Sequence, residues 1–313
     1  MIISVIIPLY NEEDIIDEFH QRVLNAMTKT GDDFEVIYVD DGSTDNTLQK
    51  LLNYHKKDSR FKVLELSRNF GHQAAYTAGL NVTLGDYVCM LDGDLQDPPE
   101  LIPEMYEKLS IGNYDIVYGK RISRKEKAGK RFFILLFHKI FSFINNVGAP
   151  DNVGNFGMMN HKAKEAFLML KEKNRYLPGL RYFIGFRQTA IEYKRPERTR
   201  GKAKMNIKSL MQLAFDALFS LSKLPLKLAF VFGFTGLGLS LVGAVVVIIK
   251  KITGAAITGW TSMMLSLFFF GSVILIFLGV MGEYIFRIYK ETQNRPVYFI
   301  RNYHTKDDKN QNS

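Results

Sequence analysis

The sequence of 313 residues contains a single cysteine, Cys89, and a single tryptophan, Trp260. One cysteine excludes an intramolecular disulfide framework and agrees with a catalytic part that works in the reducing cytoplasm. Because Cys89 lies in an apolar, strand-like run, we expect it to be a buried structural thiol. Residues 1–8 lack the basic region and the long apolar core of a signal peptide, so we expect a buried first strand there instead.

The chain also lacks charge balance. It carries 41 lysines and arginines against 32 acidic residues, a formal charge of +9. Such an excess suits nucleic acid, a phosphate-rich ligand or an anionic membrane surface. The basic residues gather beside the apolar segments of the second half of the chain, which disfavours nucleic acid as the partner.

Short apolar runs alternate with amphipathic stretches over residues 1–120. The runs predict strands at 4–9, 34–39, 61–66, 86–91 and 114–118, and the stretches predict helices at 12–28, 44–57, 72–82 and 99–110. This alternation predicts an α/β fold with a parallel sheet and helices on both faces. Ligands of such sheets bind beyond the carboxyl ends of the strands. Polar segments follow four of these strands, at 8–13, 40–45, 67–72 and 92–97, and they predict a polar crevice.

Asp92 and Asp94 directly follow an apolar strand and flank a glycine that lets the backbone turn. Both carboxylates can then reach one point, and Gln96 can add a third oxygen. Mg²⁺ is commonly held by one or two carboxylates while substrate phosphates complete its coordination. These three residues therefore predict a divalent metal site, Mg²⁺ or Mn²⁺, that grips a diphosphate and offsets the repulsion between the acids. Asp97 is expected near the cap of the following helix.

Asp40 and Asp41 end the second predicted strand. A strand-to-helix turn with Ser43 as N-cap accounts for part of this segment. It does not explain two adjacent acids, and a carboxylate here can accept the N–H of a nucleobase.

Two long apolar runs, at 228–249 and 263–285, are each long enough to span a bilayer. Flanking lysines and arginines predict that both termini and the globular domain are cytoplasmic, in a multi-pass protein of the inner (plasma) membrane. Residues 131–147 and 208–224 read as amphipathic helices in the membrane interface or as ordinary core-facing helices. Glu283, inside the second run, is expected to snorkel or to form a local pair. The predicted domains are 1–206 catalytic, 207–226 juxtamembrane helix, 227–287 two-helix transmembrane region and 288–313 cytoplasmic tail, with 307–313 disordered.

Five segments together resemble the motif set of family 2 glycosyltransferases, in particular the polyisoprenyl-phosphate group that includes bactoprenol glucosyltransferases and dolichyl-phosphate mannose synthases. They are IIPLYNEED, VIYVDDGSTDNT, SRNFGHQAAYTAGL, LDGDLQDPPE and ERTRGKAKMNIKSL. The resemblance covers nearly the whole chain. It implies a GT-A fold, a Rossmann-like nucleotide-sugar domain, followed by interfacial amphipathic helices and two transmembrane helices.

The same resemblance implies roles for individual residues. Asp94, Asn155 and Arg200 would be catalytic, and Asp92, Asp94 and Gln96 would hold the metal and diphosphate. The basic loop would meet the donor diphosphate or the lipid phosphate, although it also reads as a juxtamembrane anchor for acidic lipids. The nucleotide-contacting residues would be Pro8, Tyr10, Asn11, Glu12, Asp40 and Asp41, and the basic loop comprises Arg195, Arg198, Arg200 and Lys202 to Lys204.

Asn155 and Gly157 depart from the family pattern, because they stand where relatives carry an aspartate proposed as base and an arginine. Asparagine is no useful base at neutral pH. A lipid phosphate, however, has a second pKa near 6, so most of it is already an ionised nucleophile at pH 7. General-base help, about 10²–10⁴-fold in other reactions, then has little to act on. Asn155 can still position the acceptor.

The leading hypothesis is metal-dependent, inverting transfer of a hexose, with UDP-glucose as first donor, to undecaprenyl phosphate at the cytoplasmic membrane face. Alternatives keep the acceptor but use GDP-mannose, a UDP-N-acetylhexosamine or a UDP-aminoarabinose derivative. A processive synthase is disfavoured because the Gln-x-x-Arg-Trp motif is missing. A membrane scaffold that has lost catalysis is the non-enzymatic alternative. Homo-oligomer formation and the final cell-envelope glycan stay open.

Overall fold

The computed structural model describes residues 1–122, 153–194 except 174, and 231–306 with gaps at 237, 239–240, 244, 247–248, 250–251 and 254–258. The chain divides into two compact units. The first unit comprises Met1–Phe132, Val147–Ala203 and Arg295–Ser313, and the second comprises Phe133–Asn146 and Lys204–Asn294. The predicted interfacial helices at 131–147 and 208–224 lie outside the described residues, as does 307–313.

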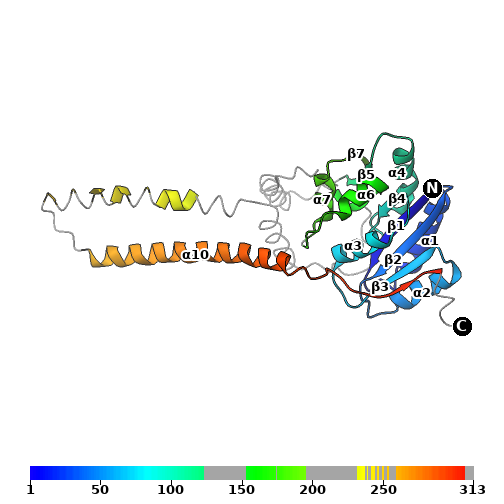
Figure 1. Ribbon diagram of the computed structural model, residues 1–313, viewed down its shortest axis with the longest axis horizontal. Coiled ribbons are helices and arrows are strands. Elements are labelled where there is room, and N and C mark those ends of the chain that lie inside the picture. The colour runs from blue at the N-terminus through cyan, green and yellow to red at the C-terminus, as the bar shows by residue number, and fades with distance from the viewer. Residues whose placement is uncertain are drawn as a thin grey trace. The chain divides into compact units, whose positions relative to one another are not determined.

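The described part of the first unit is built on one eight-stranded sheet (Figure 1). The order across the sheet is β7-β5-β6-β4-β1-β2-β3-β8. The strands are β1 (Ile2–Leu9), β2 (Asp33–Asp40), β3 (Phe61–Leu66), β4 (Tyr87–Met90), β5 (Ile116–Arg121), β6 (Val153–Asn160), β7 (Gln188–Tyr193) and β8 (Ile300–His304). The five predicted strands are confirmed within a few residues as β1 to β5.

The sheet is mixed, which corrects the expectation of a purely parallel one. β1 runs parallel to β2 and β4, β2 to β3, and β5 to β7, whereas β6 lies antiparallel between β4 and β5. β8 is antiparallel to β3 at one edge. Neither β6 nor β8 was predicted. β6 contains Gly154, Asn155 and Gly157, residue types that are depleted in strands, and so it shows no apolar run.

Helices cover both faces of this sheet, as predicted. Because side chains alternate along a strand, Ile3, Val5 and Ile7 of β1 pack on one face and Ile6 on the other. The first face carries α1 (Ile16–Thr28), α2 (Thr47–Lys57) and α4 (Ile102–Ser110), and the second carries α3 (His72–Val82), α6 (His161–Leu168) and α7 (Leu177–Phe183). Cys89 is fully buried in the first core, as expected of a structural thiol.

Two helix starts differ from the predictions. α1 begins at Ile16 rather than at residue 12, and the backbone N–H groups of Asn11 and Glu12 before it donate to the hydroxyls of Ser43 and Thr47. α2 begins at Thr47 with Asn46 at its N-cap position, so the predicted cap role of Ser43 is wrong. The hydroxyl of Ser43 ties the loops after β1 and β2 together instead.

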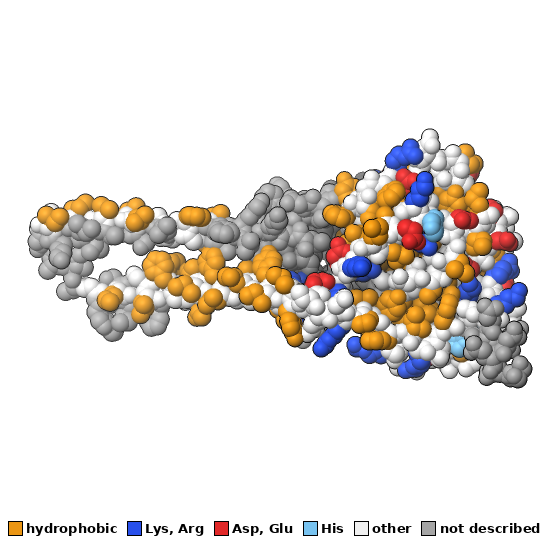
Figure 2. All heavy atoms as spheres, in the orientation of Figure 1, with side chains coloured by type: hydrophobic (Ala, Val, Ile, Leu, Met, Phe, Trp, Pro, Cys, Tyr) orange, Lys and Arg blue, Asp and Glu red, His pale blue; other side chains and the backbone are white. Residues whose placement is uncertain are grey.

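The described part of the second unit contains α10 (Trp260–Thr292), of which Phe269–Thr292 is long and apolar enough to cross a membrane. The visible side chains of this helix are mostly hydrophobic in Figure 2. Among the described residues it is the one helix that is long and apolar enough to cross a membrane. The other predicted span, at 228–249, is described only in part and is not confirmed. Glu283 forms the predicted local pair, with Nε of Arg287 2.8 Å from its Oε1.

The segment predicted as a tail contributes a strand. β8 follows α10 in the chain and pairs with β3, and the backbone N–H of Ser67 donates to the carbonyl of Phe299 at 2.9 Å. Arg301 and Asn302 of β8 both reach the buried carboxylate of Glu65, at 2.9 and 2.8 Å. Residues beyond the apolar helix therefore belong to the sheet of the first unit.

Candidate active site

The loops after β1 and β2 are linked at the carboxyl end of the sheet. Asn11 has a left-handed backbone (φ 53°), and its side-chain oxygen accepts the N–H of Thr44 at 2.8 Å. Tyr10 lies half-buried just before it, and Glu12 follows it. Pro8 is buried within β1. The predicted nucleotide-contacting segment thus lies where β1 ends, beside Asp40.

Asp40 and Asp41 have separate roles. Both oxygens of Asp41 accept backbone N–H groups, from Phe70 at 2.7 Å and Gly71 at 2.9 Å, so this carboxylate holds the loop between β3 and α3. Asp40 is 1% exposed and uses Oδ2 to accept the N–H of Ser43. Among the described residues, Oδ1 of Asp40 is buried and has no hydrogen-bond partner. An unsatisfied buried oxygen is costly, so this atom is suited to accept a donor from a ligand.

Burial is the main cause that raises the pKa of both carboxyl groups above their ordinary value. The N–H donors from Ser43 to Asp40, and from Phe70 and Gly71 to Asp41, oppose that effect. A ligand N–H at Asp40 would favour its charged form in the same way.

The turn that contains Asp92, Asp94 and Gln96 is tightly built. A Cβ on Gly93 would lie 2.4 Å from Cδ2 of Leu9 and 2.9 Å from the carbonyl oxygen of Pro8, so only glycine fits between the two acids. Leu95 has a left-handed backbone (φ 59°) although its side chain is buried. A leucine in this conformation is strained, and such strain is held only where surrounding contacts determine the backbone.

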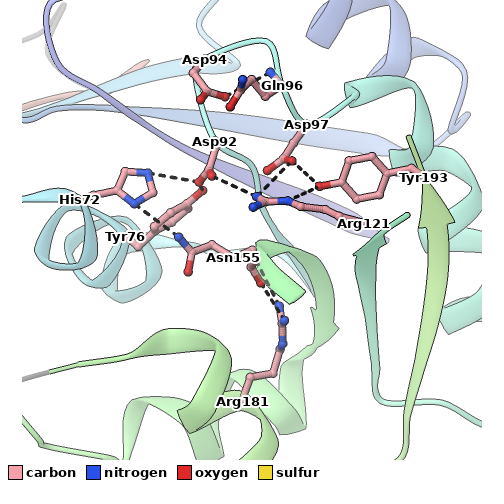
Figure 3. A network of polar contacts seen from close by, with 11 residues as sticks. His72, Tyr76, Asp92, Asp94, Gln96, Asp97, Arg121, Asn155, Arg181 and Tyr193 are labelled. Carbon is pink, nitrogen blue, oxygen red and sulfur yellow. Dashed lines mark hydrogen bonds and ion pairs between the residues drawn. The ribbon is translucent and has the colours of Figure 1, made fainter. Parts of the chain in front are cut away.

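Asp92 lies at the centre of a polar network, which Figure 3 shows. Its Oδ1 accepts the hydroxyl of Tyr76 at 2.7 Å and lies 3.2 Å from Nε2 of His72. Nη2 of Arg121 lies 4.0 Å from its Oδ2. Burial alone would raise the pKa of Asp92, but His72, Tyr76 and Arg121 outweigh it and lower the pKa to about 2.

Asp97 lies directly before the cap residue of the following turn, as predicted, but its side chain does not cap that turn. The short 3₁₀ turn at Pro99–Leu101 has Pro98 at its N-cap position and no side-chain cap. Asp97 is instead fully buried, accepts the hydroxyl of Tyr193, and lies 3.5 Å from Nη2 of Arg121. Arg121 therefore faces both Asp92 and Asp97. Arg121 and the imidazole of His72 therefore compensate the charge of Asp92, one of the two acids that the sequence assigns to a metal.

The three predicted metal ligands have different surroundings. No group of three or more His, Cys, Asp or Glu side chains within the described ranges could hold an ion. Asp92 is engaged by His72 and Tyr76, whereas Asp94 and Gln96 lie half-buried on the outer side of the turn, with Oδ1 of Asp94 accepting the N–H of Gln96 at 3.1 Å. Proteins often hold Mg²⁺ with one carboxylate while substrate phosphates and water fill the remaining coordination positions, and Asp94 fits that pattern.

Asn155 of β6 reaches this network through His72. Its amide nitrogen lies 3.4 Å from Nδ1 of His72, whose other nitrogen faces Asp92. A carboxamide offers a donor on one side and an acceptor on the other, so by turning over it can satisfy either form of the imidazole. Burial lowers the pKa of His72, but its hydrogen bond to Asp92 and the charges of Asp92 and Asp94 raise it above the ordinary value.

The side chain of Arg181 occupies the space beside Gly157. A Cβ on Gly157 would lie 2.9 Å from Nη1 of Arg181, a residue of α7. This guanidinium donates to the carbonyl of Asn155 at 3.2 Å and to that of Gly154 at 2.9 Å. Position 157 lacks the arginine of the family pattern, yet a guanidinium from another element lies beside it.

Several residues that the structure brings to this site were not predicted from the sequence. His72 and Tyr76 are one helical turn apart on α3, in a segment that had been singled out as following a strand, so their spacing was an available signal. Arg121, Arg181 and Tyr193 gave no local signal, since their neighbours lie far away in the sequence. The predicted site residues of the basic loop lie outside the described residues; they are Arg195, Arg198, Arg200, Lys202 and Lys204.

Comparisons with known proteins show the family of this chain. The sequence pattern of "Glycosyl transferase family 2" matches residues 4–167. A glycosyltransferase of Bacillus subtilis, YkcC, is 39% identical over 306 residues, covering 95% of this chain and 93% of the relative. A bactoprenol glucosyl transferase of Shigella phage SfX is 36% identical over 303 residues, covering 96% and 99%. Glucosyl-3-phosphoglycerate synthase of Mycobacterium tuberculosis, solved with Mn²⁺, UDP-glucose and phosphoglyceric acid, has a TM-score of 0.48 at 19% identity, covering 70% and 78%.

Proposed function

The chain belongs to glycosyl transferase family 2 and is a glycosyltransferase, and from this premise we propose that it transfers a hexose from a uridine diphosphate sugar to a polyisoprenyl phosphate at the cytoplasmic face of the membrane. Glucose is the first candidate for the sugar, and undecaprenyl phosphate is the acceptor. The proposal follows the relatives named bactoprenol glucosyl transferase, which this chain matches over nearly its whole length.

One observation carries the donor assignment: Oδ1 of Asp40 is buried and has no hydrogen-bond partner among the described residues. Uracil presents one N–H, at N3, to an edge-on partner. A carboxylate oxygen at the end of β2 supplies the matching acceptor in a crevice at the carboxyl ends of parallel strands. The segment with Asn11 and the loop held by Asp41 lie next to Asp40 in the structure, which supports binding of a base at this end of the sheet.

Asp94, supported by Gln96, is the residue that would hold a divalent cation, Mg²⁺ or Mn²⁺, together with the donor diphosphate. The bound ion would neutralise the charge that develops on the leaving diphosphate. Asp92 does not need to bind the ion, since His72, Tyr76 and Arg121 already hold its charge. We assign it the task of fixing the turn that presents Asp94.

An ionised acceptor phosphate is itself a nucleophile, so the protein has to orient it and balance its charge rather than remove a proton. Asn155, 9% exposed and linked to His72, is suited to orient a group at this position. The basic loop with Arg198, Arg200 and Lys202 remains the predicted partner of the two phosphate groups. Direct attack by the acceptor would invert the anomeric carbon.

Membrane attachment is supported by α10, whose segment Phe269–Thr292 is apolar enough to cross a bilayer. A lipid acceptor that stays in the membrane requires an enzyme held close to its surface. A second spanning helix at 228–249 and assembly into a homo-oligomer stay predictions.

The test is a transfer assay with full-length protein in detergent or nanodiscs. Undecaprenyl phosphate and a panel of radiolabelled sugars, namely UDP-glucose, UDP-N-acetylglucosamine, a UDP-aminoarabinose derivative and GDP-mannose, are incubated with Mg²⁺ or Mn²⁺. We expect label from UDP-glucose to enter the organic phase and to be lost with EDTA and in Asp94→Asn. Label from another donor would replace glucose in the proposal. No transfer from any donor by folded protein would refute it and favour a scaffold.

A further inference from the structure

Arg181 is a buried cation at the edge of the site. It is 2% exposed, and its two terminal nitrogens donate to the backbone carbonyls of Gly154 and Asn155. Its own carbonyl accepts the side-chain amide of Gln188 in β7 at 2.9 Å. Both ends of the residue are therefore tied to strands. Figure 3 shows the guanidinium directed at the backbone of Asn155.

The guanidinium fits only because position 157 is glycine. A Cβ there would lie 2.9 Å from Nη1 of Arg181 and 2.8 Å from the carbonyl oxygen of Val117. The Tyr118 ring lies 5.3 Å from Cζ of Arg181, within the range of a cation–π contact. Burial lowers the pKa of Arg181 to about 10, so the group stays charged at neutral pH.

Burying a charge is costly unless the surrounding contacts are well made. The contacts that Arg181 makes are with two consecutive carbonyls of β6, and the second belongs to Asn155. The side chain of this same residue points to His72, 3.4 Å away, and His72 lies 3.2 Å from Asp92. One guanidinium thus fixes the backbone from which the amide of Asn155 reaches the site.

We propose that Arg181 is a positioning residue for the transfer step and that it acts through Asn155. Its guanidinium occupies the space beside Gly157 and from there holds the backbone of Gly154 and Asn155. The proposal rests on the proposed function for its kinetic consequence but not for its structural one. Asp40 and Asp41 lie on other elements, and so donor binding does not depend on this contact.

The experiment compares Arg181→Met with Arg175→Met in full-length protein. Arg175 is a matched control, because its Nη2 also donates to a backbone carbonyl, that of Phe167 at 3.3 Å, and its Cζ lies 5.4 Å from an aromatic ring. Burial lowers the pKa of Arg175 as well. Within the described residues, its hydrogen bond and its ring contact are both with Phe167 of α6, which lies outside the site. Arg181→Lys keeps the charge but has a single donor nitrogen in place of the two that reach the carbonyls, so it serves as the conservative variant.

The first readout is amide hydrogen exchange over residues 153–157, which needs no catalytic activity. We expect faster exchange there in Arg181→Met, a smaller increase in Arg181→Lys, and no change in Arg175→Met. Unchanged exchange in Arg181→Met would overturn the proposal even if the enzyme proves to use another substrate. Failure of the transfer assay in the wild-type protein would instead refute the proposed function and leave this readout intact.

The second readout is a double-mutant cycle with Asn155→Ala. Arg181→Met is expected to lower turnover about tenfold or more, since misplacing a positioning group can cost about 10²-fold, while the dissociation constant of UDP changes less than about twofold. If Arg181 acts through Asn155, the double variant is no slower than the slower single variant. Additive losses, or equal losses of UDP affinity, turnover and thermal stability, would show a merely structural role and overturn the proposal.

Discussion

The hydroxyl of Tyr76 donates a hydrogen bond to Oδ1 of Asp92 across 2.7 Å. Tyr76 is fully buried on α3, and Asp92 stands at the end of β4 with its side chain 15% exposed. The contact joins a helix on one face of the sheet to the turn that carries Asp94. It is one of the contacts that keep Asp92 ionised in a buried place.

Tyr76→Phe should therefore weaken both stability and transfer. A hydrogen bond to a charged group contributes about 1.5–3 kcal/mol, so we expect the free energy of unfolding to fall by roughly that amount. Transfer should fall about tenfold, because the turn that presents Asp94 is less well fixed. Tyr54→Phe is the control, since Tyr54 donates to Asp17, which lies on the exposed surface of α1. Equal loss of transfer in both variants would contradict the assignment.

Asp40→Asn and Asp41→Asn should separate ligand binding from folding. Asp40 is assigned to the base, so Asp40→Asn should weaken UDP binding by about 1–3 kcal/mol in calorimetry without lowering the melting temperature. Asp41 accepts two backbone N–H groups, so Asp41→Asn leaves one of them poorly satisfied and should lower the melting temperature by several degrees. The reverse pattern would exchange the two roles.

Arg301→Met tests whether β8 supports the loop at 67–71. Arg301 donates to Glu65 and to the carbonyl of Ser67, both at 2.9 Å. Glu65 is buried and would keep only Asn302 among these partners, so we expect a loss of about 1–3 kcal/mol in stability and weaker UDP binding. Lys120→Met removes an ion pair with Glu192 in which both side chains are exposed, and it should cost much less stability. Unchanged UDP binding in Arg301→Met would separate β8 from the donor site.

His20 should make the protein acid-sensitive well above the range of its carboxylates. Burial lowers the pKa of His20 from 6.5 to about 4, and its Nδ1 lies 3.0 Å from the hydroxyl of Tyr38. Between pH 6.5 and about 4, His20 is protonated in the unfolded chain but not in the folded chain. Stability is therefore complete above about pH 6.5 and falls by about 3 kcal/mol as the pH drops to 4.

His20→Gln should remove this slope while keeping a polar partner for Tyr38. Urea unfolding at a series of pH values measures the effect in both proteins. If the wild type and the variant lose stability in parallel between pH 6.5 and 4, His20 is not the group responsible.

The parts of the fold that were predicted correctly share one physical cause. β1 to β5 are short, buried strands, so each one shows in the sequence as an apolar run. β8 carries Arg301, Asn302 and His304 at an exposed edge, and β6 is interrupted by glycine and asparagine, so hydrophobicity marks neither. Antiparallel pairing of β6 depends on contacts with β4 and β5 that no local pattern encodes.

The residues of the candidate site also fall into two groups, those that the sequence marks and those that depend on tertiary contacts. Asp40, Asp94 and Asn155 were located because strand ends and motif spacing mark them. Other contacts of the site depend on tertiary partners that the sequence does not show. Asp41 holds the loop at Phe70 and Gly71, and Asp97, which was expected near a helix cap, also pairs with Arg121 and Tyr193. Arg181 could not be predicted, because the space beside Gly157 exists only once α7 packs on β6.

The position of β8 also sets an order of events during synthesis. Because α10 precedes β8 in the chain, the ribosome completes the apolar helix before it makes the strand that pairs with β3. Domains begin to fold from their amino-terminal parts while translation continues. The nascent first unit therefore waits with an open edge at β3, and its loop at 67–71 gains the support of Phe299 and Arg301 only after the apolar helix has been made.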